Sequence, residues 1–390
     1  MKLPRARRAA ATMMAMVGLL AGCGAPATVS LAAARGAGSS RSVQLTKAIR
    51  RVMREASIPG AIVGVWQGGK APYVQTFGVR NRATGRPMLT SLYMRVGSET
   101  KTFTVTALLQ LVDRKKIGLD DPIARYVQGV PDGTAITLRE LADMRSGLYN
   151  YTNDPAWQEA FGRNPYRQWL PRQLLAYSFS HPLMFKPGTK FFYSNTNTIL
   201  LGLVVEKVAR LPLATFIKRY VLRPEHLAHT VFPPGAQFPA PHAQGYAGPS
   251  PKGPLVNVTN WNPSWGWAAG AMISTLGDLR NWARIVATGE LLTPATQKQR
   301  ERFLPTGIRG VRAGYGLGLF KDNGWIGHNG SLPGYQSLTI YLPSKRATVV
   351  VLVNSDINYQ GSELTTLLGE AITKIITPHH VYYLPPSPQG

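Results

Sequence analysis

A serine hydroxyl is a weak nucleophile until a neighbouring group takes its proton. Ser98 and Lys101 offer such a pair, three positions apart at the start of an apolar helix predicted over residues 102–114. On a helix this spacing places both side chains on one face, about 5–6 Å apart at Cβ. A buried lysine amine loses its proton near neutral pH, because burial disfavours the ammonium form. The pair predicts a lysine-activated serine nucleophile, and its alternative is an ordinary helix start with Ser98 as the N-cap.

A second segment, Tyr193-Ser194-Asn195, precedes a long apolar helix predicted over residues 196–210. A tyrosine beside a lysine can act as general base for the serine and later as general acid for the leaving group. Asn195 offers both a donor and an acceptor, which suits the amide of a substrate. An N-cap motif in a loop is the alternative interpretation of the segment.

A third segment, His328-Asn329-Gly330-Ser331, stands at the end of a strand predicted over residues 324–328. A strand edge can present a backbone N–H to an oxyanion. Gly330 would let the substrate backbone approach closely. His328 would orient the tyrosine or contact a carboxylate, and the alternative is a histidine at a strand-to-turn junction.

In this order the three segments resemble the motifs of the serine β-lactamase and penicillin-recognising family, which are Ser-x-x-Lys, Tyr-x-Asn or Ser-x-Asn, and Lys-Thr-Gly. The similarity extends over about residues 45–376 and is to the branch of class C β-lactamases, DD-carboxypeptidases and β-lactamase-like esterases. It implies a hydrolase that cleaves an ester or amide through an acyl-enzyme. The substrate would be a small molecule or a peptidoglycan-type compound, and no cofactor or metal is implied.

The resemblance also implies a role for each matching residue. Ser98 is the acylated nucleophile, Lys101 its partner, and Tyr193 the general acid and base. Asn195 contacts the acyl amide of the substrate, and the backbone N–H groups of Ser98 and Ser331 form the oxyanion hole. The sequence leaves open whether Lys101 or Tyr193 takes the proton from the serine.

The third motif departs from the family pattern, since His328-Asn329-Gly330 replaces Lys-Thr-Gly. Without a permanent cation there, binding of a β-lactam or peptide carboxylate is weakened. Ester hydrolysis or DD-peptidase-type chemistry is therefore favoured over rapid β-lactam hydrolysis. A slowly turning over β-lactamase or penicillin-binding protein is an alternative, as is a catalytically weak envelope-binding lipoprotein.

The elements that must position these residues form an α/β pattern. Strands are predicted near both ends of the chain, at residues 61–67, 73–79, 324–328, 336–341 and 348–353, with helices between them. We expect an α/β domain from residues 42–87 and 268–380, with a mostly helical domain of residues 88–267 inserted into it, and a tail of residues 381–390. The resemblance implies a mainly antiparallel sheet flanked by helices, as in the β-lactamase/transpeptidase-like fold.

The N-terminus has the pattern of a secretory signal, with a basic segment at residues 1–8 followed by an apolar one at 9–22. It ends in Leu20-Ala21-Gly22-Cys23, which resembles the lipobox of bacterial lipoproteins. We predict a signal peptide over residues 1–22, a lipid on Cys23 and a flexible tether to residue 41. The protein would then be exported and held on a membrane of the cell envelope by its lipid. A plain signal peptide with an incidental cysteine is the alternative.

The chain is strongly basic, with 44 Lys and Arg against 19 Asp and Glu and a formal net charge of +25. The basic residues are scattered, and no zinc-finger or RNA-binding signature is present, so no nucleic-acid partner is predicted. A basic surface in contact with an anionic cell envelope is the expected reason for the charge. Nothing in the sequence indicates the oligomeric state.

Overall fold

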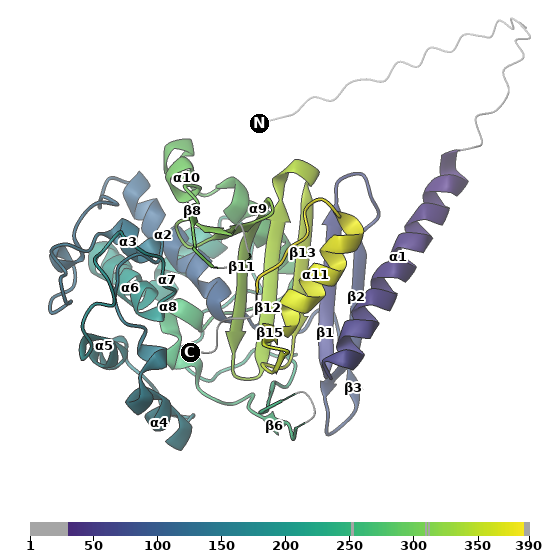
Figure 1. Cartoon of the computed structure of the whole chain (residues 1–390), viewed down its shortest axis with the longest axis horizontal. Helices are drawn as coiled ribbons and strands as arrows, with labels where there is room; N and C mark the ends of the chain where they lie inside the picture. Colours follow the sequence, from purple (N-terminus) through teal and green to yellow (C-terminus); the bar gives the residue numbers. More distant parts are fainter. Residues whose placement is uncertain (1–29, 251–252, 309, 311–312, 386–390) are drawn as a thin grey trace, which may run out of the picture.

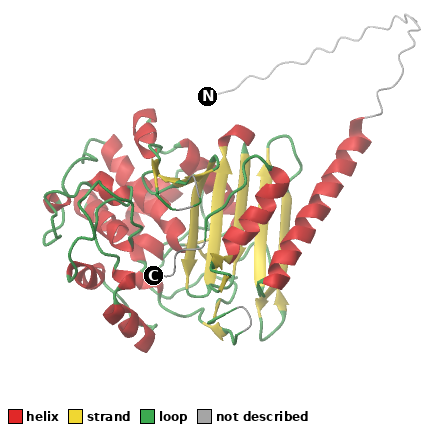
Figure 2. Cartoon of the chain, in the orientation of Figure 1, coloured by secondary structure: helices red, strands yellow, loops and turns green. Residues whose placement is uncertain are grey.

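The computed structural model describes residues 30–250, 253–308, 310 and 313–385 (Figure 1). A large sheet lies on one side and a cluster of helices on the other (Figure 2). The sheet is antiparallel, with its strands in the order β3-β2-β1-β13-β12-β11-β10-β9-β8. In that order their bounds are Arg86–Pro87, Tyr73–Asn81, Gly60–Gln67, Ala347–Val353, Tyr335–Leu342, Trp325–Leu332, Phe320–Asp322, Gly314–Tyr315 and Leu304–Pro305.

The central strands are buried because helices cover both faces of the sheet. Helices α1 (Ser30–Glu55) and α11 (Leu364–Ile376) pack together on one face, and α9 (Leu276–Thr288) packs on the other (Figure 1). Every residue of β13, whose sequence is Ala-Thr-Val-Val-Val-Leu-Val, is buried. Such a near-continuous apolar run is typical of a strand covered on both faces. The sheet is thus a rigid platform for the residues at its edges.

The helical side is built around α2 (Thr100–Asp113) and α6 (Asn195–Ala209), which pack against each other and are buried over most of their length. These are the two helices that begin at the first two sequence motifs. The other α-helices are α3 Leu138–Ala142, α4 Pro155–Arg163, α5 Pro171–Phe179, α7 Leu213–Ile217, α8 Trp267–Gly270 and α10 Pro294–Arg300. Three small ladders pair β4 Met94–Arg95 with β7 Ile273–Ser274, β5 Tyr246–Ala247 with β6 Val256–Asn257, and β14 Asn358–Tyr359 with β15 Ser362–Glu363.

The predicted fold class is confirmed, with a mainly antiparallel sheet flanked by helices. The hairpin expected from residues 61–67 and 73–79 is present as β1 and β2. The division into an α/β domain and an inserted helical domain stays a prediction. The larger buried cluster joins the helical side to the sheet, from Leu108 and Leu201 to Leu352.

The tether predicted up to residue 41 is wrong from Ser30 onward, where α1 begins. The segment starts with Leu-Ala-Ala-Ala, and alanine has the highest helix propensity of all residues, so a lack of apolar periodicity does not exclude a helix. Cys23 and the predicted signal sequence lie outside the described residues. Within the part of the chain that is described, no helix combines the length and the apolar character needed to cross a bilayer.

Candidate active site

Ser98 lies in the sharp turn η1 (Gly97–Glu99), which runs directly into α2. The N-cap position of α2 is taken by Glu99, without a side-chain capping bond. Ser98 is therefore not the N-cap of this helix, which removes the ordinary structural explanation for its hydroxyl. Gly97 has φ +50°, and a Cβ there would stand 2.7 Å from the backbone nitrogen of Ser331, so only glycine fits at this turn.

Lys101 is fully buried in the first turn of α2, directly below Ser98. Its Nζ lies 3.0 Å from Ser98 Oγ, 2.7 Å from Asn195 Oδ1 and 2.9 Å from the carbonyl oxygen of Ala269. Burial holds the pKa of the amine well below its usual range. A neutral amine has two N–H donors and one lone pair. The two carbonyl oxygens take the donors, and the lone pair is left for the serine proton.

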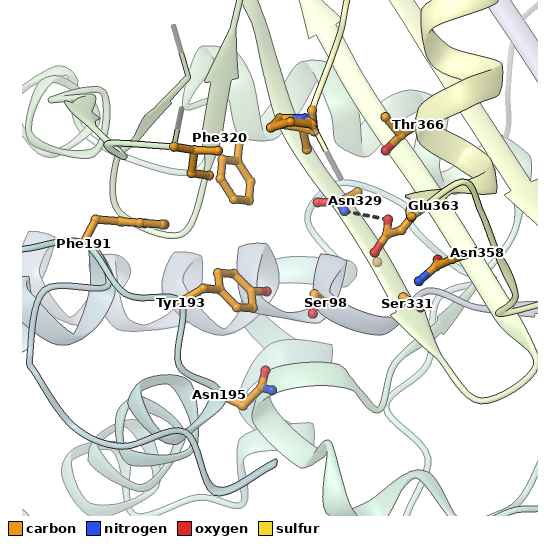
Figure 3. Close-up of a pocket in the computed structure, with 15 residues that line it drawn as sticks. Ser98, Phe191, Tyr193, Asn195, Phe320, Asn329, Ser331, Asn358, Glu363 and Thr366 are labelled. Carbon is orange, nitrogen blue, oxygen red and sulfur yellow. Dashed lines mark hydrogen bonds between the residues drawn. The ribbon is translucent and has the colours of Figure 1, made fainter. Parts of the chain in front are cut away.

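Tyr193 lies above the same pair, and its phenol oxygen points toward Ser98 (Figure 3). Its ring centroid is 4.8 Å from Lys101 Nζ. The phenol oxygen is buried and makes no hydrogen bond within the described residues. Burial raises the pKa of the phenol, and the adjacent Ser98 hydroxyl opposes part of this rise. The phenol therefore keeps its proton and can donate it to a group that arrives beside Ser98.

Asn195 is the first residue of α6 and lines the cavity, but its amide already has protein partners. The oxygen accepts from Lys101 as described, and the nitrogen donates to Thr152 Oγ1 at 3.3 Å. Its contact with Lys101 was not predicted from the sequence, and its predicted contact with the substrate stays a prediction. Ser194 occupies the N-cap position of α6 without a capping bond, which argues against an N-cap motif.

His328 lies inside β11 rather than at its end, which corrects the sequence prediction. The strand continues to Leu332, and the chain reverses only at Pro333-Gly334, where Gly334 adopts φ +85°. The imidazole is buried 3.3 Å from the hydroxyl of Tyr315 and packs against Phe320. Burial is the main cause that lowers its pKa to about 3. A neutral imidazole cannot replace the missing lysine of the third motif.

Gly330 brings β11 against the turn that carries the nucleophile. A Cβ at this position would stand 2.0 Å from the carbonyl oxygen of Val96 and 2.9 Å from the backbone nitrogen of Ser98. The close neighbour of Gly330 in the structure is thus the turn η1, and the approach of a substrate backbone to Gly330 stays a prediction. The contact sets the backbone nitrogens of Ser98 and Ser331 on one small region of the surface, as two oxyanion donors require.

These residues surround a cavity of about 380 Å³. Figure 3 shows Ser98 between an aromatic side and a polar side. The sequence missed Glu363, whose carboxylate accepts a hydrogen bond of 2.8 Å from Asn329 Nδ2. No motif points to Glu363, because only the fold brings it to β11. The described residues that line the cavity are Ser98, Phe191, Tyr193, Asn195, Ile308, Phe320, Asn329, Gly330, Ser331, Asn358, Gly361, Glu363, Thr366, Leu384 and Pro385.

The chain is similar to several known proteins. Residues 45–371 match the family described as Beta-lactamase. A solved structure of a D-stereospecific amidohydrolase from Streptomyces sp. is 33% identical and superposes with a TM-score of 0.73, over 80% of this chain and 94% of that one.

Two more distant proteins are also similar. D-amino acid amidase from Ochrobactrum anthropi SV3, solved with L-phenylalanine amide, has a TM-score of 0.75 at 22% identity, over 85% of this chain and 97% of that one. This likeness shows the fold alone. Protein flp from Staphylococcus aureus (strain N315) is 25% identical over 325 residues, which are 81% of this chain. The match spans 64% of the length of that protein.

Proposed function

Since this chain belongs to the Beta-lactamase family, we propose that it is a serine hydrolase that cleaves an ester or amide through an acyl-enzyme on Ser98. The observation that carries the proposal is the buried amine of Lys101, 3.0 Å from Ser98 Oγ and fixed by two carbonyl oxygens. A buried amine with a lowered pKa beside a hydroxyl is the arrangement that activates a serine without histidine.

Acylation begins when Ser98 Oγ attacks the substrate carbonyl and its proton passes to Lys101 Nζ. The negative charge moves to the carbonyl oxygen, where the N–H groups of Ser98 and Ser331 stabilise it. As the intermediate collapses, the bond to the leaving group breaks. Tyr193 donates its proton to that group, and the proton held by Lys101 returns to the phenol.

Deacylation repeats these steps with water as the nucleophile. The water gives its proton to the Tyr193 and Lys101 pair, and its oxygen bonds to the acyl carbon. The ester bond to Ser98 then breaks, and Ser98 Oγ takes up the proton. The free acid leaves, and the hydroxyl and the amine are restored.

The substrate class follows from the charges around the cavity. Among its described lining residues there is no lysine, arginine or histidine, and His328 behind them is neutral. A substrate with a carboxylate beside the scissile bond, such as a β-lactam or a D-Ala-D-Ala peptide, would find no positively charged side chain among these residues to form an ion pair with its carboxylate. We therefore favour esters and small amides, and amides of D-amino acids are included because of the similarity to the D-stereospecific amidohydrolase.

The test is a labelling and turnover experiment on the wild type and Ser98→Ala. A fluorophosphonate probe is expected to label the wild type only. A panel of p-nitrophenyl esters, amino acid amides, D-Ala-D-Ala peptides and β-lactams, followed by intact-mass detection, identifies the acyl adduct. Equal labelling of both proteins would remove the enzyme proposal and favour a catalytically weak envelope protein. Rapid turnover of a chromogenic cephalosporin without ester hydrolysis would reverse the substrate ranking.

We also propose that the protein is exported and held at the cell envelope by a lipid on Cys23. The support is the sequence alone, in which a basic and then apolar leader ends at a lipobox-like Leu20-Ala21-Gly22-Cys23. In that location the active site would face small molecules of the envelope.

A further inference from the structure

Glu363 is a carboxylate inside the proposed active-site cavity that no step of the mechanism uses. It is the only acidic residue among the described residues that line the cavity. It occupies the N-cap position of α11 but makes no capping bond to that helix. Within the described part of the chain it takes part in no ion pair. The ordinary structural uses of a glutamate at a helix start are therefore absent here.

The surroundings of this carboxylate leave it incompletely satisfied. Its hydrogen-bond partner within the described residues is the side-chain amide of Asn329, which donates one bond of 2.8 Å. An ionised carboxylate can accept about four hydrogen bonds. Figure 3 shows the group directed toward Asn329, on the polar side of the cavity that Ser98 also lines. The side chain is half-buried, and burial raises the pKa of its carboxyl, although the bond from Asn329 opposes part of this rise. Its charged form is therefore stabilised best by a positively charged partner.

Glu363 is also electrically coupled to the catalytic phenol. Its negative charge contributes to the raised pKa of Tyr193. The phenol of Tyr382 is affected in the same direction. A cation bound at Glu363 would cancel that field and make it easier for Tyr193 to give its proton to the leaving group. Binding of the right substrate would therefore also assist the chemical step.

We propose that Glu363 is a specificity-determining residue that binds a positively charged amino group of the substrate. The inference rests on the proposed hydrolase function and narrows its substrates to esters or amides with an ammonium group near the scissile bond. The aromatic side formed by Phe191, Tyr193 and Phe320 then receives an apolar part of the same molecule. Substrates with a carboxylate at this position are repelled.

The test compares pairs of substrates that differ only by a charged nitrogen in place of carbon. For the acyl half the pair is D- or L-alanine p-nitroanilide against isobutyryl p-nitroanilide. For the leaving half it is butyrylcholine against 3,3-dimethylbutyl butyrate. The two pairs determine which half of the substrate carries the cation. In the wild type we expect kcat/KM to favour the charged member of at least one pair by about 10- to 100-fold, the range for a charge-assisted contact.

Glu363→Gln removes the charge but keeps an oxygen that can accept from Asn329. This variant is expected to reduce the preference to about parity, because the charged member loses its partner. The neutral p-nitroanilide should be hydrolysed at least as fast as by the wild type, because the charge that raises the pKa of Tyr193 is gone. The matched control is Glu370→Gln, which removes a carboxylate from the exposed pair with Lys374 on the same helix. This control should leave unchanged both the preference for the charged substrates and kcat/KM for the neutral ones. No preference in either pair, or a preference that persists in Glu363→Gln, would overturn the inference.

A binding measurement separates this inference from the hydrolase proposal. Calorimetry with Ser98→Ala measures the affinity for each member of the pairs without turnover. If the charged member binds more tightly and Ser98→Ala with Glu363→Gln loses this difference, Glu363 is the cation site even when the wild type hydrolyses nothing. If turnover occurs but affinity and kcat/KM are the same for the charged and the neutral member of each pair, the hydrolase proposal stands and the proposed role of Glu363 is wrong.

Discussion

Lys101 and Tyr193 are both buried beside Ser98. Burial lowers the pKa of the amine and raises the pKa of the phenol. Each is held in its neutral form, because a low-dielectric environment disfavours both the ammonium and the phenolate. The sequence left open which residue takes the serine proton. In the proposed mechanism the amine, which has a free lone pair, is the base, and the phenol, which still holds its proton, is the acid.

Tyr193→Phe removes the acid and keeps the aromatic ring over Lys101. We expect kcat for a p-nitroanilide to fall by about 10² or more, as for loss of a general acid. A p-nitrophenyl ester should lose less, because its leaving group departs without a proton. Steady-state kinetics on both substrates check this, with circular dichroism to confirm folding. Unchanged kinetics on the anilide would exclude Tyr193 from the mechanism.

His328 gives a pH dependence of stability with a definite sign. Its folded pKa of about 3 lies below the ordinary value of about 6.5, so between these values the unfolded chain binds more protons. The free energy of unfolding should therefore rise by roughly 1.4 kcal/mol per pH unit from about pH 3 to 6.5, and level off above it. His328→Gln lacks this contribution.

Urea denaturation of the wild type and His328→Gln at several pH values between 4 and 8 measures the difference in unfolding free energy. Other buried acids, such as Glu99 with a pKa raised by burial to about 8, titrate in both proteins and cancel in the difference. We expect the advantage of the wild type to shrink as the pH falls below 6.5. A difference that stays constant with pH would contradict the buried neutral imidazole.

The residues that sequence alone could identify are those whose partner lies within one helical turn or within a motif. Ser98 and Lys101 belong to this class, and Tyr193 follows from its motif. Glu363 and the engagement of Asn195 with Lys101 could not be predicted, because each depends on a contact between elements distant in the chain. Spacing in sequence carries no information about such contacts.

At the scale of elements, the site depends on how closely strand β11 approaches turn η1. Ser337 on the next strand also binds this turn, since its hydroxyl donates to the carbonyl oxygen of Val96 at 2.9 Å. The central strands β1, β2, β12 and β13 and the helices α2 and α6 were predicted from the sequence, because apolar periodicity determines them. The exact end of β11 was not, since the reversal at Pro333-Gly334 places His328 within the strand.

Gly330→Ala tests this approach. Its Cβ would stand 2.0 Å from the carbonyl oxygen of Val96, so turn and strand must separate. We expect a loss of about 1–3 kcal/mol in unfolding free energy, as for overpacking, together with a large fall in kcat from the displaced oxyanion donors. Denaturation and ester kinetics measure the two effects.

The matched control is Gly277→Ala in the exposed first turn of α9, where a Cβ meets nothing within 4 Å. It should keep full activity and gain about 0.5–1 kcal/mol, the usual advantage of alanine over glycine in a helix. If Gly330→Ala behaves like this control, the close approach of β11 to η1 is not needed for catalysis.

At the scale of the whole molecule, the first and last helices of the described chain close one side of the sheet together. Leu45 and Ile49 of α1 belong to the same buried cluster as Leu368 and Ile372 of α11. Cys23 is the only cysteine, so no disulfide within the chain can contribute to stability. The folded body therefore depends on its two buried clusters. In the proposed arrangement, the segment before α1 serves only to hold this body at the membrane.

Cys23→Ala tests the proposed lipid anchor against simple adsorption of a basic protein. A net charge of +25 would itself hold the chain on anionic lipid, but that attraction is screened at 1 M salt, where the Debye length is about 3 Å. A lipid chain resists the same wash, since its burial does not depend on charge. We expect the wild type to stay in the membrane fraction after a 1 M salt wash and Cys23→Ala to be released with full esterase activity. Retention of Cys23→Ala through the wash would show that another feature holds the protein on the membrane.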